Sequence, residues 1–418
     1  MISYEYVASG LGHIKPFNKA LLDNKAVLAE LKKDIIKPIQ SENNSFSMLY
    51  NSYTEPKFGD ILSDYYKDAL YKIHADSGGL QVVTLGKKIT DDLKRDVYKN
   101  QANYANIGMS FDEIPVITTA ERSSAANLND RLFDRENLDQ YITKSVDNLL
   151  TQIRFYKEHK SDCKPMYILH GNDYQTLMYW YRKSFDLIPL EYRNEIGGIA
   201  LTDSAMGNGL VEDIIQAFAM REISKEFQKF HLLGIGSVRR LVPYIIQLQK
   251  TNKDCHLSYD STTLTQGMSY GRFYTDFKTI KLGRSFNNNH IILKKMVDQM
   301  FQGIYNSSEE LFFNALNSNS SFFMRDDKID EELLLKYYQI TYSTFFLSIK
   351  NFMNDVYKIS NDKNEMVRLM EVSNLLKEFI LIDNLNTIDD LNYLSKTFIK
   401  KSSKIPSSDS INDINRFF

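Results

Sequence analysis

The middle of the chain repeats one pattern, in which a short apolar run ends in small or polar residues and a stretch of helical periodicity follows. His170 and Asp203, near the ends of two such runs, are 33 residues apart, and Asp203 and Gly236 are again 33 residues apart. This spacing is about the length of one strand–helix–strand unit. The pattern occurs six times, at residues 71–79, 104–115, 165–173, 196–204, 230–237 and 255–263.

Two further runs of strand-like sequence precede these six, at residues 4–10 and 45–52. Eight strands, most of them followed by a helix, predict an α/β fold of the (β/α)8 TIM-barrel type. A doubly wound open sheet is the alternative. Polar residues end nearly every run, which favours the barrel, because barrel enzymes assemble their sites from the ends of many strands, whereas an open sheet uses one switch point.

The alternation of strands and helices stops near residue 290, and the sequence that follows has helical periodicity without intervening strands. The longest such stretches are residues 333–359 and 364–382. We therefore expect a barrel domain over residues 1–290 and a helical C-terminal region over 291–400. The last segment, 401–418, is rich in Lys and Ser and is expected to be a flexible tail.

The charge and cysteine content narrow the classes of function. The chain has 51 Lys and Arg against 53 Asp and Glu, a formal charge of −2, so any nucleic-acid contact must come from local basic groups. Two cysteines are too few for a disulfide framework or a Cys-rich zinc site, and they suit a reducing compartment. The N-terminus does not resemble a signal peptide and no run is long enough to span a bilayer, so we expect a cytoplasmic protein without a membrane partner.

Acidic residues and one histidine follow the predicted strands: Asp76, Asp112 with Glu113, His170, Asp203 and Asp260. Carboxylates that converge on one face repel one another and lose water, which raises some of their pKa values. A carboxylate nucleophile and a carboxyl general acid can use that setting to cleave a glycosidic bond. The same donors could hold a divalent ion for metal-assisted hydrolysis, and the spacing alone leaves both chemistries open.

Simpler interpretations apply to each of these residues alone. An Asp after a strand is often a helix N-cap or a turn residue, and this explanation suits Asp203 and Asp260. No H-x-H or H-E-x-x-H pairing supports a zinc hydrolase. The functional interpretation therefore depends on the joint placement of the set at one end of a barrel.

Six segments resemble, in order, the motifs of the tRNA-guanine transglycosylase family. They are DSGGLQV (76–82), MSFDEIP (109–115), ILHGN (168–172), IGGIALTD (196–203), HLLGIGSVRRLV (231–242) and SYDSTTLTQG (258–267). Members of that family are β/α barrels that exchange a guanine base in a polynucleotide for a 7-deazaguanine. The resemblance therefore implies a pentosyltransferase whose partners are a nucleic acid and a free 7-deazaguanine base.

The resemblance also assigns roles by position. Asp260 would attack C1′ and form a covalent glycosyl-enzyme intermediate, while Asp76 would transfer the proton that the base exchange requires. Asp112 would accept hydrogen bonds from N1 and the 2-amino group of guanine. Leu80 and Leu233 would clamp the two faces of the base. The remaining substrate-binding positions are Ser77, Gln81, His170 and Gly171, with Gly197 and Gly198 approaching O6 and Asp203 sensing the 7-substituent.

The chain departs from the family pattern in ways that affect the expected substrate. Leu80 replaces an aromatic residue, His170 a glutamine, Asp203 a glutamate and Gln266 an arginine. The Cys-x-Cys-x-x-Cys…His zinc element of the tRNA enzymes is absent, so we expect neither a metal nor another cofactor. Relatives encoded by bacterial viruses use the same barrel on DNA, and the missing zinc element favours DNA over tRNA.

Three alternatives to the DNA enzyme remain at the level of sequence. The first is a tRNA-modifying enzyme, the second is a catalytically inactive barrel that binds nucleic acid, and the third is a metal-dependent hydrolase that uses the same carboxylates. A homodimer is compatible with each. Candidate phosphate contacts are Arg239, Arg240, residues 278–284, Lys400, Lys401 and Lys404.

Overall fold

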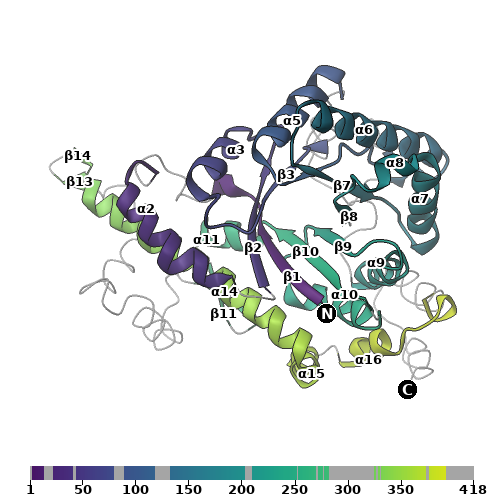
Figure 1. The fold of residues 1–418 in the computed structure, drawn as a ribbon. Coiled ribbons are helices and arrows are strands. Elements are labelled where there is room, and N and C mark those ends of the chain that lie inside the picture. Colours follow the sequence, from purple (N-terminus) through teal and green to yellow (C-terminus); the bar gives the residue numbers. More distant parts are fainter. Residues whose placement is uncertain are drawn as a thin grey trace.

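Eight parallel strands close into a barrel in the computed structural model, as the sequence predicted (Figure 1). The order around the barrel is β1-β10-β9-β8-β7-β4-β3-β2, so the open-sheet alternative is wrong. The strands are β1 (Ile2–Ala8), β2 (Asn44–Asn51), β3 (Ile73–Asp76), β4 (Ile107–Met109), β7 (Lys164–Leu169), β8 (Gly198–Thr202), β9 (Lys229–Leu233) and β10 (Cys255–Ser261).

The structure describes most of the barrel and part of the C-terminal region. The described residues are 2–13, 22–40, 44–79, 89–117, 132–202, 210–251, 253–269, 272–275, 277–281, 324–325, 328–329, 331–372 and 376–391. The boundary expected at residue 290 and the tail expected at 401–418 lie outside these ranges.

Helices connect the strands and cover the outside of the barrel, where Figure 1 shows them as a ring. Side-chain caps start three of them: Asn24 Oδ1 accepts from Val27 N, Thr90 Oγ1 accepts from Leu93 N, and Asp173 and Thr176 form a capping box. These helices are α2 (Lys25–Leu31), α3 (Lys57–Ile61), α5 (Asp91–Tyr104), α6 (Leu138–Glu158), α7 (Tyr174–Leu187), α8 (Leu190–Arg193), α9 (Leu210–Ile223), α10 (Val238–Gln249) and α11 (Thr263–Ser269).

Short elements fill several connections. Turns of 3-10 or π type are η1 (Leu11–His13), η3 (Lys32–Ile36), η4 (Lys37–Ile39) and η5 (Leu62–Tyr66). Three antiparallel pairs stand apart from the barrel: β5 (Val116–Ile117) with β6 (Leu132–Phe133), β11 (Arg272–Thr275) with β12 (Lys278–Lys281), and β13 (Met324–Arg325) with β14 (Lys328–Ile329).

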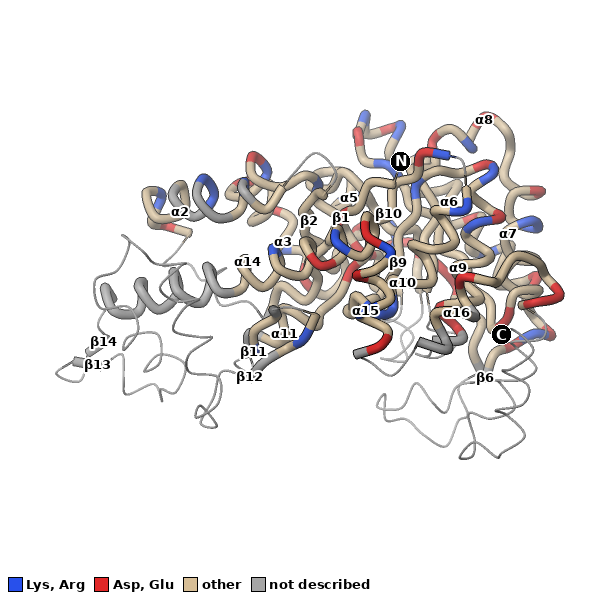
Figure 2. Tube along the Cα trace, turned by 90° about the horizontal axis from the view of Figure 1, so that it is seen from below, with Lys and Arg blue, Asp and Glu red and all other residues tan. Residues whose placement is uncertain are grey.

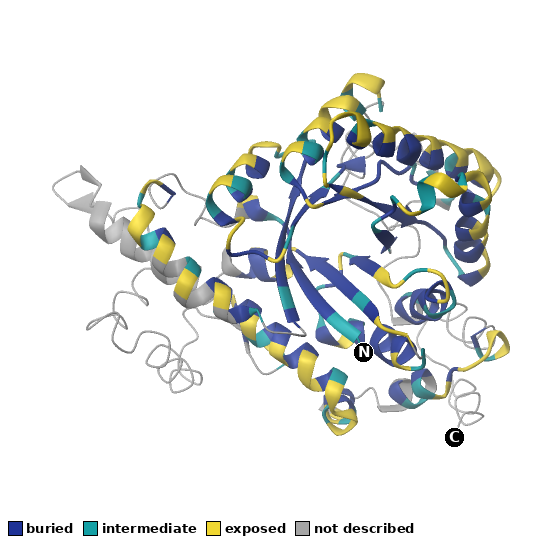
Figure 3. Ribbon diagram, in the orientation of Figure 1, coloured by how far each residue is buried: buried dark blue, intermediate teal, exposed yellow. Residues whose placement is uncertain are grey.

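The C-terminal helices pack onto the barrel. They are α14 (Glu331–Asn361), α15 (Lys363–Val372) and α16 (Leu376–Asn384), and their buried apolar side chains belong to the same hydrophobic cluster as the barrel's outer face. The ring of Phe352 on α14 lies 5.4 Å from Tyr6, 6.0 Å from Tyr259 and 5.1 Å from Tyr274. Figure 3 shows the buried residues along this contact. α14 therefore covers the seam where β1 and β10 close the barrel.

A buried carboxylate fixes the β11–β12 hairpin to the same helix. Asp355 is 1% exposed, and its Oδ2 accepts hydrogen bonds from the Tyr274 hydroxyl at 3.1 Å and from Phe277 N at 2.7 Å. Lys358, one turn further along α14, pairs with the other oxygen of Asp355 at 3.1 Å.

Within the described residues, no helix is long and apolar enough to cross a membrane.

The contact of α14 with the barrel seam predicts a large effect for Phe352→Ala. Truncating a buried phenylalanine removes its packing and leaves a cavity, which costs about 3–5 kcal/mol. We expect the free energy of unfolding, measured by urea denaturation, to fall by about that amount. The control is Lys350→Ala on the exposed side of the same helix, and equal small effects in both variants would show that α14 does not stabilise the barrel.

Candidate active site

Three carboxylates from three strands gather at the carboxyl end of the barrel. Asp76 is the last residue of β3, Asp112 follows β4, and Asp260 is the penultimate residue of β10. Asp112 and Asp260 are 6% and 7% exposed, while Asp76 keeps partial access to solvent. The charges of Asp112 and Asp260 both act on Asp76, so the three groups form one cluster. The convergence expected for these three residues is therefore present.

Burial and the neighbouring carboxylates of this cluster raise the pKa of Asp76. Burial, followed by the negative charges of Asp112 and Asp260, raises the pKa of Asp76 to about 7, although the backbone N–H groups of Ser77 and Gly78 oppose the shift. Asn51 Nδ2, at the end of β2, donates to Asp76 Oδ2 at 3.0 Å. A carboxyl group with this pKa can both release and take up a proton near neutral pH.

The two glycines after Asp76 let the chain pass between crowded neighbours. Gly78 has φ +78°, which favours glycine, and a Cβ there would lie 2.7 Å from Tyr53 Cβ. A Cβ on Gly79 would lie 2.9 Å from Asp112 Oδ1. Ser77 is buried, and its Oγ accepts from Gly79 N at 3.4 Å. The glycines thus make room for the second carboxylate of the cluster.

Asp260 is held through one of its two oxygens. Gly234 N donates to Asp260 Oδ1 at 3.0 Å, and His231 Nε2 lies 3.4 Å from the same oxygen. Gly234 has φ +78°, so the turn after β9 that aims this N–H requires glycine. Among the described residues, the polar contacts of Asp260 all go to Oδ1, which leaves Oδ2 unengaged.

His170 binds Asp112, an interaction that the sequence did not predict. His170 Nε2 lies 2.6 Å from Asp112 Oδ2, and the fully buried imidazole packs edge-on against Trp180 at 5.1 Å. The neighbouring Gly171 is required by packing, since a Cβ there would lie 2.5 Å from Leu177 N at the start of α7. His170 therefore orients the carboxylate that was expected to recognise guanine.

Other predicted positions lie further from the carboxylates or outside the described residues. Gly197 and Gly198 are at the amino end of β8, and a Cβ on Gly198 would come within 2.6 Å of Lys229 O. Tight strand packing explains both glycines, and no contact among the described residues joins them to the three carboxylates. Leu233 ends β9 and packs against the cluster inside the barrel. Leu80, Gln81 and Asp203 lie outside the described residues.

The basic residues that were expected to contact phosphates differ in whether their side chains are free to bind a nucleic acid. Arg240 forms a two-point ion pair with the buried Asp213, at 2.8 and 2.9 Å, so its guanidinium stabilises the barrel wall. Lys278 is exposed, whereas residues 282–284, Lys400, Lys401 and Lys404 lie outside the described residues. In the view of Figure 2, basic and acidic residues alternate over the described helices.

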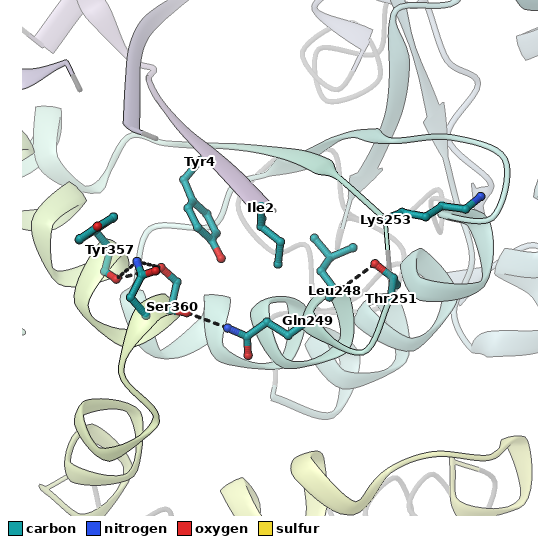
Figure 4. A pocket seen from close by; sticks show the side chains of 9 residues that line it. Ile2, Tyr4, Leu248, Gln249, Thr251, Lys253, Tyr357 and Ser360 are labelled. Atoms are coloured by element: carbon teal, nitrogen blue, oxygen red, sulfur yellow. Dashed lines mark hydrogen bonds between the residues drawn. The ribbon is translucent and has the colours of Figure 1, made fainter. Parts of the chain in front are cut away.

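Two hollows lie outside the carboxylate cluster. One, of about 300 Å³, is at the amino end of the barrel, where Ile2 and Tyr4 face Gln249 and Ser360 (Figure 4). The other, of about 590 Å³, is lined in part by Ser52 and Tyr53, the two residues that follow Asn51 in the sequence.

In the described part of the chain, no group of three or more His, Cys, Asp or Glu residues is placed to hold a metal ion.

Neither a scan against protein-family models nor a search of curated proteins finds a match for this chain. Its function is therefore argued from the residues of the site.

Three contributors to the site were not predicted from the sequence. Asn51 is the last residue of β2 and His231 the third residue of β9, both at positions that face the barrel interior, and the Gly234 N–H belongs to the backbone. Strand alternation around Asp260 would have pointed to His231, because β9 neighbours β10 in the barrel. The contact itself depends on the register between the two strands.

The raised pKa of Asp76 predicts a pH-dependent effect of Asp76→Asn on stability. Because this pKa is higher in the folded protein than in the unfolded chain, ionisation destabilises the fold above about pH 7, and the penalty disappears as the pH falls toward the ordinary value near 4. We expect Asp76→Asn to be more stable than the original protein by about 2 kcal/mol at alkaline pH, with no advantage near pH 4.

The measurement is urea denaturation at several pH values, with the exposed Asp162→Asn as control. A constant difference between Asp76→Asn and the original protein across this pH range would contradict the raised pKa.

Proposed function

We propose that this chain is a base-exchange transglycosylase that replaces guanine in DNA with a 7-deazaguanine derivative through a covalent aspartyl-glycosyl intermediate. The observation that carries the proposal is the pairing of two unlike carboxyl groups at one barrel mouth. Asp260 has one oxygen held by a backbone N–H and the other without a hydrogen-bond partner among the described residues, whereas Asp76 has a pKa of about 7. This division suits a nucleophile and a proton carrier.

The first half of the reaction removes guanine. Asp260 Oδ2 forms a bond to C1′ while the C1′–N9 bond breaks, and the electron pair of that bond stays on the guanine. Asp76 in its protonated form donates the proton that the leaving base requires. The Gly234 N–H, fixed on Oδ1, keeps the other oxygen of Asp260 directed for attack.

The second half reverses these roles. N9 of the incoming 7-deazaguanine attacks C1′, its N–H proton passes to the Asp76 carboxylate, and Asp260 leaves as a carboxylate. Asp76 thus ends the cycle protonated, as it began. A group with a pKa of about 7 suits both steps, because near neutral pH it can donate a proton and accept one at little cost in free energy.

Asp112 is the group that we assign to base recognition. A carboxylate can accept two parallel hydrogen bonds from N1 and the 2-amino group of guanine, a pattern that adenine, cytosine and thymine do not offer. The contact with His170 fixes the plane of Asp112 before the base arrives.

The choice of DNA rests on the residues that the chain lacks. A zinc element built from three cysteines and a histidine is impossible with two cysteines, and both Cys163 and Cys255 are buried in the barrel wall. The tRNA-presenting element of the resembling family therefore has no counterpart. Reaching C1′ inside duplex DNA requires extruding the target nucleotide, at a cost of a few kcal/mol.

An inactive nucleic-acid-binding barrel accounts less well for the site. Clustered buried carboxylates destabilise a fold, and a binding protein gains nothing from a carboxyl group whose pKa is raised by its neighbours. An enzyme that uses these carboxyl groups in catalysis accounts for their presence in one cluster.

Incorporation of a labelled base tests the proposal directly. Labelled guanine or 7-deazaguanine is offered with duplex DNA, single-stranded DNA and tRNA side by side. We expect label in DNA and not in tRNA. Label in tRNA alone would assign the chain to tRNA modification, and label in none of the three would contradict a transglycosylase.

Removal of the nucleophile should abolish the covalent intermediate. We expect Asp260→Ala to lower adduct formation with DNA by at least about a thousandfold, because the residue that forms the bond is gone. Denaturing gels of protein and labelled DNA report the adduct, and Asp186→Asn on the exposed surface is the matched control. An adduct that persists in Asp260→Ala would assign the nucleophile to another residue.

The pKa of Asp76 predicts opposite pH dependences for the two half-reactions. Adduct formation with guanine release needs protonated Asp76 and should slow as the pH rises through about 7. Attack by the 7-deazaguanine on the isolated adduct needs the carboxylate and should become faster over the same range. Rapid-quench measurements of each half-reaction check this, and equal pH profiles would remove Asp76 from proton transfer.

A further inference from the structure

The interior of the barrel is partly polar, where such barrels are normally filled by branched apolar residues. An apolar cluster takes side chains from β1, β2, β4, β7 and β8, among them Val7, Leu49 and Met166. The interior also carries a set of buried polar side chains from β1, β2, β3, β9 and β10. They are Glu5, Ser47, His74, His231 and Ser258.

Most of this polar set serves Glu5. Its Oε1 accepts from Ser47 Oγ at 2.5 Å and contacts His74 Nε2 at 2.7 Å, while its Oε2 contacts His256 Nε2 at 2.6 Å. Burial opposes ionisation, but His74 and His256 together hold the pKa of Glu5 well below its usual range. Glu5 is therefore a satisfied buried carboxylate, and it does not need His231.

His231 instead faces Asp260. Its Nδ1 lies 2.9 Å from Ser258 Oγ, and its Nε2 lies 3.4 Å from Asp260 Oδ1. The ring is fully buried, with Ala200 beside it on β8 and the His74 ring 5.6 Å away on β3. Among the described residues, Nε2 has no hydrogen-bond partner, and Asp260 Oδ1 approaches it only at ion-pair distance.

The hydrogen atoms of this group can be assigned from its partners. Ser258 Oγ lies 3.0 Å from Phe230 O, which can only accept, so the single hydroxyl hydrogen of Ser258 goes to that carbonyl. Ser258 Oγ then accepts from His231, which places a hydrogen on Nδ1. A neutral His231 would consequently place the lone pair of Nε2 3.4 Å from a carboxylate oxygen, which is repulsive. One additional proton on Nε2 removes that repulsion.

We propose that His231 is a positioning residue that carries a proton on both ring nitrogens and pairs with Asp260 as a buried imidazolium. This inference rests on the proposed function for its role in catalysis, but the ion pair itself does not depend on the substrate. The imidazolium keeps Asp260 ionised next to Asp76 and Asp112, and together with the Gly234 N–H it fixes Oδ1. No proton moves from His231 during the reaction.

The pair affects both halves of the exchange. When Oδ2 bonds to C1′, Asp260 becomes a neutral ester, and the buried imidazolium loses its counter-charge. The protein therefore disfavours a long-lived ester and favours the return of the carboxylate when the incoming base attacks. A reversible base exchange requires this balance, since an overly stable intermediate would stop the second half.

The protonation of His231 can be measured without any substrate. The 15N chemical shifts of its ring nitrogens, assigned with a His231→Gln sample, distinguish a nitrogen that carries hydrogen from one that does not. Near neutral pH we expect both nitrogens to carry hydrogen in the original protein, and Nε2 to lose its hydrogen in Asp260→Asn. An unprotonated Nε2 in the original protein would overturn the proposal.

Kinetics test what the pair does. We expect His231→Gln and His231→Leu to slow adduct formation per folded molecule by at least about tenfold, because a charge-assisted contact to the nucleophile is lost. Ser258→Ala, which removes the acceptor for Nδ1–H, should have a smaller effect in the same direction. The matched control is His159→Gln, at an exposed histidine on the outer end of α6.

The outcomes separate this inference from the proposed function. Adduct formation at the original rate in both His231 variants would overturn the positioning role and leave the transglycosylase intact. A loss of thermal stability with an unchanged adduct rate would show that His231 only packs. No adduct in the original protein would overturn the function and the catalytic role together, whereas the 15N result would still decide the ion pair.

Discussion

Repulsion between three carboxylates at one barrel mouth is the constraint on which the rest of the site depends. Each carboxylate meets it in a different way. Asp112 is bound by His170, and Asp260 is bound by the Gly234 N–H beside His231. Asp76 has a pKa of about 7, so it can hold a proton. These three environments distinguish groups of identical chemistry, and so each carboxylate can take a separate role.

The barrel tolerates a polar interior because much of its stability lies outside it. Aromatic side chains that alternate with the interior residues of β1 and β10 pack outward, and α14 covers them through Phe352. The outer layer and the C-terminal helices form one hydrophobic cluster, separate from the small apolar cluster within the barrel. Interior positions are thereby free to carry Glu5 and the histidines, whose burial would otherwise be too costly.

The sequence predicted all eight strands, because strand-like runs ending in polar residues mark each unit of such a barrel. It also predicted the meeting of Asp76, Asp112 and Asp260, since parallel strands in a closed barrel share one carboxyl end. It did not predict that His170 would bind Asp112, or that Asn51 and His231 would contact the other two. Those contacts depend on register and rotamers, which no pattern in a single strand encodes.

The charge at the mouth connects the site to its proposed substrate. Three ionised carboxylates would repel the phosphates of any polynucleotide. A proton on Asp76 and an imidazolium at His231 each lower the net negative charge of this cluster, and His170 holds the third carboxylate, Asp112. The protonation that prepares Asp76 to release guanine also lets the phosphate backbone approach. Adduct formation and binding would therefore weaken together as the pH rises.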